Sequence, residues 1–195
     1  MNPRRATVTR KTRETFVEAA LHLDGTGEAD VKTGVGFFDH MLEILARHAD
    51  FDLSLRAEGD LQVDDHHTVE DCALVLGRAL DEALESRRGV ARFGWALAPL
   101  DEALARAVID LSGRPSANID LGLAGQRLGT LTAEMLPHFF TSLTVTGRFA
   151  LHLDVIRGAN DHHRAEAAFK AVALALRQAV SGTGNDEIRS TKGSL

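Results

Sequence analysis

The sequence has little of several residue types on which particular protein classes depend. Its 195 residues include one cysteine, one tryptophan and no tyrosine, and no run of 18 apolar residues occurs. A single cysteine excludes a disulfide framework within the chain and a cysteine-rich zinc site. We expect no membrane-spanning helix and, because no apolar segment lies near the N-terminus, no signal peptide. A cytoplasmic protein is therefore predicted.

The sign of the charge argues against a general nucleic-acid-binding protein. The formal net charge is −6, whereas that class usually carries a basic face. The basic residues at 4–13 have no aromatic residues between them, and we interpret them as a solvated edge. Apolar residues make up 44% of the chain, which is enough for a sizeable core without disulfides.

Histidine, in contrast, is abundant, and the nine histidines fall into a repeated order. Residues 37–48 (FFDHMLEILARH) resemble residues 134–143 (EMLPHFFTSL), and DDHHTVEDCALVLGRAL resembles NDHHRAEAAFKAVALAL. An internal repeat of this kind indicates one structural unit used twice. We predict a single domain, 1–195, built from half-repeats at about 5–90 and 91–188, with a C-terminal tail at 189–195.

Hydrophobic periodicity gives the elements of each half. Apolar and polar residues alternate at 15–24, 51–57 and 143–155, which predicts strands. Apolar residues recur at steps of three and four at 69–84 and 165–180, which predicts two long helices. The expected fold class is therefore α+β, with two homologous halves that each combine a small β-sheet with two helices covering one of its faces.

The ends of the two long helices carry recognisable signals. Asp64 or Asp65 is the predicted N-cap of the first helix, and Asn160 or Asp161 that of the second, because short polar side chains satisfy the free N–H groups of a first turn. The Gly-Thr-Gly sequence at 182–184 is predicted to end the second helix.

Both long helices open with the pattern His-His-x-x-x-Glu, which predicts two metal sites. The first histidine and the glutamate lie four residues apart and share one face of the helix, whereas the second histidine points about 100° away. We expect each ion to take a His–Glu pair from one helix, the second histidine from the other helix, and one further histidine from a short helix. The predicted metal ligands are His40, His66, His67, Glu70, His138, His162, His163 and Glu166.

Four protein ligands would leave two positions of an octahedron open, as catalytic sites require. The donor set is compatible with zinc, iron or manganese, and the carboxylates favour manganese slightly. The alternative is a set of helix-capping and core histidines. We interpret His22 and His152 as structural, and His48 is not a predicted metal ligand.

With these motifs in place, the sequence resembles the imidazoleglycerol-phosphate dehydratase family of histidine biosynthesis. The resemblance covers nearly the whole chain through TRKTRET, GVGFFDHML, DDHHTVED, PLDEALARAVIDLSGRP, HFFTSL, GANDHHRAEAAFKA and STKG. It implies helices packed between two sheets and a large symmetric homo-oligomer, commonly of 24 chains, with metal sites shared between subunits. At 195 residues we expect the monofunctional form, without the phosphatase domain fused to it in some bacteria.

The resemblance also implies the roles of individual residues. It implies two Mn²⁺ ions per active site on the eight ligands above, with other divalent metals possible. Its substrate-binding positions match Glu14, His40, His48, Arg92, Arg114, Lys170, Ser190, Thr191 and Lys192. Arginine and lysine suit a phosphate monoester. Glu14 is the candidate for proton transfer because it is not needed as a ligand; Glu102, its repeat partner, and Asp101 are weaker candidates.

The implied reaction is metal-dependent dehydration of imidazoleglycerol phosphate to imidazoleacetol phosphate. Our hypothesis is that it passes through a metal-bound imidazolate and a diazafulvene-like intermediate as the C3 hydroxyl leaves.

A dinuclear phosphoesterase is the second enzyme hypothesis, although such sites use bridging carboxylates. A metal-storage oligomer and a family member that binds without catalysing are further alternatives. The predicted partners are the substrate and other copies of the chain, with no nucleic acid and no membrane. Which subunit supplies each ligand stays open.

Overall fold

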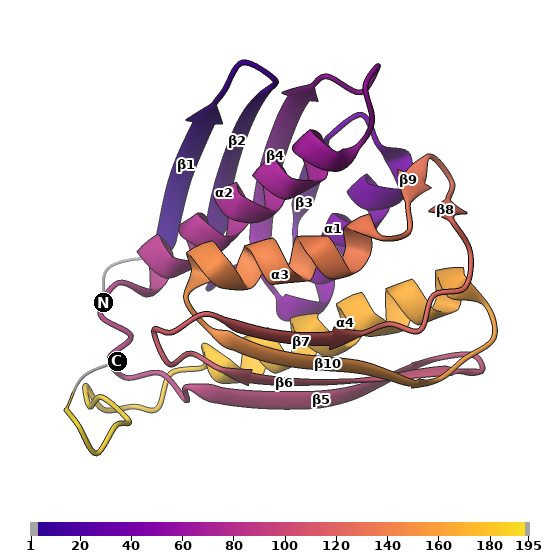
Figure 1. Cartoon of the computed structure of the whole chain (residues 1–195). Coiled ribbons are helices and arrows are strands. Elements are labelled where there is room, and N and C mark those ends of the chain that lie inside the picture. The colour runs from indigo at the N-terminus through magenta and orange to yellow at the C-terminus, as the bar shows by residue number, and fades with distance from the viewer. Residues whose placement is uncertain (1–3, 194–195) are drawn as a thin grey trace.

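Within residues 4–193, which the computed structural model describes, four helices lie between two four-stranded sheets (Figure 1). The first sheet has the strand order β1-β2-β4-β3. Its strands are β1 (Arg5–Lys11), β2 (Thr15–His22), β3 (Ala29–Lys32) and β4 (Asp52–Gly59). The β1–β2 and β2–β4 pairs are antiparallel, and β3 joins β4 in parallel.

The second sheet repeats this topology in the order β5-β6-β10-β7. Its strands are β5 (Phe93–Leu100), β6 (Ala103–Asp110), β7 (Ser116–Asp120) and β10 (Ala150–Arg157); β8 (Arg127–Leu128) and β9 (Leu131–Thr132) form a separate hairpin. The β5–β6 and β6–β10 pairs are antiparallel, and β7 joins β10 in parallel. The predicted α+β fold with two equivalent halves is confirmed.

Each short helix packs against the long helix of the other half. The helices are α1 (Gly36–Ala49), α2 (His66–Leu84), α3 (Met135–Gly147) and α4 (Asp161–Ala179). The long helices α2 and α4 pack on the sheets of their own halves, as predicted. The short helix α1, however, packs against α4 of the second half, and α3 packs against α2 of the first half. Each histidine-bearing short helix therefore lies beside the long helix of the opposite half (Figure 1).

Contacts between buried aromatic rings fix the positions of α1, α3 and α4 relative to one another. The ring of Phe139 on α3 lies 5.3 Å from Phe38 on α1 and 5.5 Å from Phe169 on α4, centroid to centroid. All three rings are fully buried. Burial of such a side chain contributes about 1.5–3 kcal/mol to the free energy of unfolding. This contact joins the first turn of α1 to α3 and to the middle of α4.

The predicted strand at 143–155 is wrong in its first part. Helix α3 continues to Gly147, and β10 begins only at Ala150. The β-branched residues at 144–146 favour a strand locally, but the buried residues of this segment follow a helical spacing. A Cβ on Gly77 of α2 would lie 2.5 Å from the carbonyl oxygen of Leu143. The close α2–α3 packing that Gly77 permits therefore overrides the local strand preference.

The helix ends agree with the sequence only in part. The side chain of Asn160 accepts from the backbone N–H groups of His162 and His163, which confirms this N-cap. At α2, Asp64 accepts from the N–H of His66 at 2.9 Å, whereas the side chain of Asp65 makes no capping hydrogen bond. Helix α4 ends at residue 179, three residues before the predicted glycine signal.

The short strands β3 and β7 have four and five residues, too few for a clear alternation, and the sequence analysis missed both. None of the helices within residues 4–193 has the length and hydrophobicity of a membrane span.

Candidate metal centre

Three predicted ligands from both halves of the chain meet at the N-terminus of α4. His162 and Glu166 lie one turn apart on α4, and His40 reaches them from α1. The Nε2 atoms of His40 and His162 lie 3.2 and 2.9 Å from Oε1 of Glu166. All three donor atoms lie within 4.8 Å of one another. We call these three residues the α4 cluster.

A second cluster has the same composition at the N-terminus of α2. His66 and Glu70 come from α2, and His138 comes from α3. Nε2 of His138 lies 3.2 Å from Oε1 of Glu70, and Nε2 of His66 lies 4.0 Å from Oε2. We call these residues the α2 cluster. Because each cluster combines both halves, neither could form in a half-repeat alone.

The two clusters fit a divalent metal by the chemistry of their donors. Each offers two imidazoles and one carboxylate converging within 4.8 Å, a set that suits manganese, iron or zinc. The histidine side chains of both clusters are one third to one half exposed. Three ligands with an open side leave room for a further ligand and for substrate.

The carboxyl group of Glu166 is held in its anionic form. Burial alone raises its pKa, but hydrogen bonds from Lys170, His162 and His40 outweigh burial and lower the pKa to about 2. Nζ of Lys170 lies 2.9 Å from Oε2 of Glu166. The corresponding position after Glu70 is Leu74, so the cation that Lys170 places beside the α4 cluster has no counterpart at the equivalent position of α2.

The remaining two predicted ligands, His67 and His163, join neither cluster within the described part of one chain. Nδ1 of His67 lies 3.0 Å from a carboxylate oxygen of Asp60, and Nδ1 of His163 lies 2.7 Å from Glu102. These hydrogen bonds raise the pKa of both histidines. The expectation that the second histidine completes the site on the other helix is therefore not met inside a single chain.

Both carboxylate oxygens of Glu102 accept hydrogen bonds. One of its oxygens accepts from the backbone N–H groups of Ala159 and Asn160, and the other from His163. The backbone N–H of Asn160 contributes most, and together these hydrogen bonds lower the pKa of Glu102 to about 2. Such an anion is poorly suited to carry a proton near neutral pH. Its neighbour Asp101 lies 3.8 Å from Nε2 of His163.

Glu14 lies in the turn between β1 and β2, and its carboxylate has no hydrogen-bond or ion-pair partner among residues 4–193. The turn itself is fixed. The hydroxyl of Thr12 accepts from the N–H groups of Glu14 and Thr15, and the Thr15 hydroxyl donates to buried Asp71 of α2. The charge of Glu14 contributes to the raised pKa of His67. Glu14 therefore lies near the N-terminus of α2.

His48 and Lys170 lie on the same side of the α1–α4 pair. Burial lowers the pKa of His48, and the positive charge of Lys170 lowers it further. Since Lys170 also contacts Glu166, both predicted substrate-binding residues are near the α4 cluster.

The other predicted phosphate ligands lie at the opposite end of the chain's fold. The N–H of Arg92 donates to the carbonyl of Ala179, the last residue of α4, at 2.9 Å. A helix of 19 residues spans about 28 Å, so Arg92 is about 25 Å from His162. Within one chain the structure does not bring Arg92 to either cluster.

Arg114 and the C-terminal tail lie at this same end. The guanidinium of Arg92 pairs with Asp110 at 2.7 Å and donates to the carbonyl of Arg189, which places Ser190, Thr191 and Lys192 beside it. The backbone carbonyl of Arg92 accepts from Leu111, and exposed Arg114 follows three residues later.

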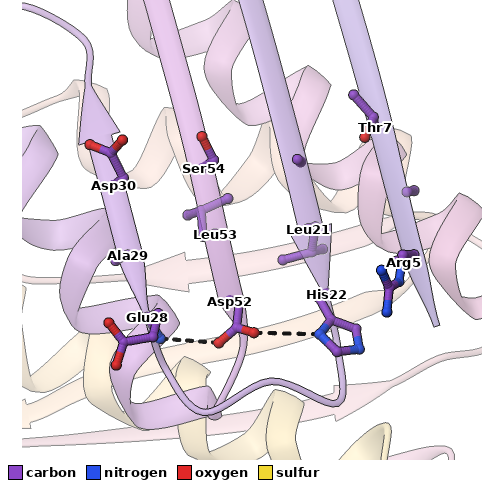
Figure 2. A pocket seen from close by; sticks show the side chains of 12 residues that line it. Arg5, Thr7, Leu21, His22, Glu28, Ala29, Asp30, Asp52, Leu53 and Ser54 are labelled. Carbon is purple, nitrogen blue, oxygen red and sulfur yellow. Dashed lines mark hydrogen bonds and ion pairs between the residues drawn. The ribbon is translucent and has the colours of Figure 1, made fainter. Parts of the chain in front are cut away.

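A groove of about 660 Å³ on the outer face of the first sheet is separate from this chemistry. It lies over β1, β2, β4 and β3, and none of the predicted site residues lines it. Figure 2 shows Asp52 there between the ring of His22 and the backbone of Glu28, with Nδ1 of His22 at 3.4 Å. This contact agrees with the interpretation of His22 as structural.

Asp60 was not among the predicted site residues, and Glu102 was predicted only as a weaker candidate for proton transfer, not as the partner of His163. Asp60 follows β4 directly and belongs to none of the recognised motifs, so no signal in a single sequence marks it. For Glu102 a signal was available, because this residue directly precedes β6 just as Glu14 directly precedes β2.

Comparisons with known proteins converge on one family. The family model described as "Imidazoleglycerol-phosphate dehydratase" matches residues 33–176. Curated proteins of that name from Salinibacter ruber and Phytophthora nicotianae are each 53% identical. The first alignment covers 100% of this chain and 96% of the relative, and the second covers 98% and 42%. A crystal structure of the Staphylococcus aureus dehydratase matches with a TM-score of 0.83 and 35% identity, covering 92% of this chain and 99% of that one.

Proposed function

The chain belongs to the imidazoleglycerol-phosphate dehydratase family, hydro-lyases of histidine biosynthesis, and we propose that it works with two divalent metal ions, Mn²⁺ first among them. The observation that carries the proposal is the pair of clusters, in which two imidazoles and one carboxylate from both halves converge within 4.8 Å. We also propose that the protein acts in the cytoplasm.

The α4 and α2 clusters would each hold one ion. When bound, Mn²⁺ would supply a Lewis acid for the nitrogens of the substrate imidazole, which would favour loss of the ring N–H proton and so make the ring better able to expel the hydroxyl on the attached carbon. The fourth protein ligand of each ion would be His67 or His163 of a neighbouring copy, because neither reaches a cluster in its own chain.

The dehydration removes a hydroxyl from the carbon attached to the ring and a proton from the next carbon. Together they leave as water, and the resulting enol becomes the ketone. Glu14 is the proposed proton carrier because its carboxylate, unlike that of Glu102, has no partner among the described residues. Lys170 adds a hydrogen-bond donor beside the α4 cluster, and His48 lies close enough for the charge of Lys170 to lower its pKa further.

The phosphate would bind at Arg92, Arg114 and residues 190–192, about 25 Å from the α4 cluster of the same chain. A substrate of this size cannot span that distance, so a complete site needs more than one copy of the chain. We propose a closed, symmetric homo-oligomer, for which the family resemblance suggests 24 subunits.

A direct assay tests the proposed function. Protein purified with Mn²⁺ is given imidazoleglycerol phosphate, and imidazoleacetol phosphate is measured with and without a chelator. We expect product that disappears with the chelator and returns when Mn²⁺ is restored. Product formation that the chelator does not affect would overturn the metal proposal. Release of inorganic phosphate without the ketone would favour the dinuclear phosphoesterase.

A further inference from the structure

Two carboxylates hold the two histidines that stand outside the clusters. Asp60 lies 3.0 and 3.2 Å from Nδ1 of His67, and Glu102 lies 2.7 Å from Nδ1 of His163. Both contacts are made at the same ring nitrogen, although the two carboxylates come from different kinds of segment: Asp60 follows a strand, and Glu102 precedes one.

The choice of nitrogen decides what the ring can do. A neutral imidazole has one N–H donor and one nitrogen with a free lone pair. A carboxylate at Nδ1 accepts a hydrogen bond there, which keeps the proton on Nδ1 and leaves the lone pair on Nε2. Carboxylate partners of this kind orient metal-binding histidines and increase their basicity.

Close backbone approaches bring the carboxylates to these positions. A Cβ on Gly59 would lie 2.1 Å from the hydroxyl oxygen of Thr68 in the first turn of α2. A Cβ on Gly158 would lie 3.0 Å from Cβ of Ala103, beside Glu102. Glycine at 59 therefore lets the end of β4 approach the first turn of α2. Glycine at 158, where a Cβ would also lie 2.9 Å from Cγ of Arg164, lets the end of β10 approach α4.

The two halves use carboxylates from different positions to bind the second histidine of the long helix. Glu14 and Glu102 hold the same place, directly before β2 and β6. In the second half Glu102 binds the histidine itself, and residues 158–160 contain no carboxylate. In the first half Asp60 binds the histidine, which leaves Glu14 without a partner in the described part of the chain.

We propose that Asp60 and Glu102 are positioning residues that hold His67 and His163 with Nε2 directed to metal in a neighbouring copy, and that Asp60 thereby releases Glu14 for proton transfer. Nε2 of His163 lies 3.8 Å from Asp101, beyond hydrogen-bond distance, so this carboxylate does not occupy it. This inference rests on the proposed function, since it requires that the histidines bind metal.

Glu102→Gln is the sharpest probe. The amide oxygen of glutamine can remain with the N–H groups of Ala159 and Asn160 and preserve the loop. Its NH₂ group then faces Nδ1 of His163 and favours the proton on Nε2, where it blocks metal binding. Only the ion that binds His163 should be affected, so we expect one of the two Mn²⁺ ions to bind roughly 10- to 100-fold more weakly than in the unsubstituted protein. The circular dichroism spectrum should stay unchanged.

Asp60 offers a graded comparison. An asparagine side chain in its place would retain a carbonyl oxygen that can accept from Nδ1, whereas alanine offers no acceptor. We therefore expect Asp60→Ala to weaken Mn²⁺ binding by roughly 10- to 100-fold and Asp60→Asn to restore part of the affinity. Asp154→Ala is the matched control, because Asp154 pairs with Arg106 on neighbouring strands, at 2.8 Å, and contacts no predicted ligand.

Manganese affinity is measured by isothermal titration of the intact oligomer, and the Mn²⁺ electron paramagnetic resonance spectrum reports the ligand environment. Affinities and spectra of Glu102→Gln and Asp60→Ala equal to those of the Asp154→Ala control would overturn the inference alone. Failure of the unsubstituted protein to bind Mn²⁺ would overturn the proposed function as well.

Discussion

Replacing Glu14 with glutamine is expected to lower kcat for dehydration by about 100- to 10,000-fold and to leave the manganese content unchanged. The turn that carries Glu14 is fixed by the Thr12 and Thr15 hydroxyls and by Asp71. None of these contacts uses the Glu14 carboxylate, so the substitution removes the proton carrier without removing a structural contact. Steady-state kinetics and metal analysis of the same preparation measure both quantities.

Glu18→Gln is the matched control for this variant. Glu18 is an exposed glutamate on β2, in the same hairpin, and its carboxylate accepts only a long hydrogen bond, 3.4 Å, from Thr9. We expect kcat of this control to match the unsubstituted protein. If Glu14→Gln also turned over at that rate, Glu14 would have no part in proton transfer.

Two inactive variants are expected to restore activity when they assemble together. Glu14 lies by the N-terminus of α2, whereas Arg114 lies by the C-terminal end of α4. Arg4, just before β1, donates to the carbonyl of Val180 beyond that end of α4. The seven residues of β1 then carry the chain about 23 Å toward Glu14. One chain therefore cannot supply both residues to one substrate.

The test is co-expression of Glu14→Gln and Arg114→Ala chains with different affinity tags, followed by purification of mixed oligomers. If each site takes Glu14 and Arg114 from two chains, random mixing leaves about a quarter of the sites with both residues intact. Activity should rise to about that fraction of the unsubstituted protein. Activity no higher than the mean of the two homogeneous variants would mean that one chain supplies both residues.

Local patterns were sufficient to predict much of this molecule. The His-His-x-x-x-Glu spacing correctly placed His66 with Glu70 and His162 with Glu166, because residues four apart share a helix face whatever the tertiary structure. The matching order of motifs predicted equivalent halves, and both sheets have the same strand order.

What the sequence could not predict depends on contacts between distant segments. Nothing in residues 37–48 shows that His40 joins the cluster of the other half, since this follows from the packing of α1 on α4. The strand assignment around Val145 failed because packing against Gly77 decides the conformation there. Asp60 was missed because its role exists only where β4 meets the first turn of α2.

The most direct test of the account is anomalous X-ray scattering from crystals grown with Mn²⁺. Two manganese peaks are expected per chain, one among His40, His162 and Glu166 and one among His66, Glu70 and His138. Each peak should have one further imidazole, His67 or His163, from a neighbouring chain. Manganese bound elsewhere, or clusters without anomalous density in crystals of active protein, would contradict the account.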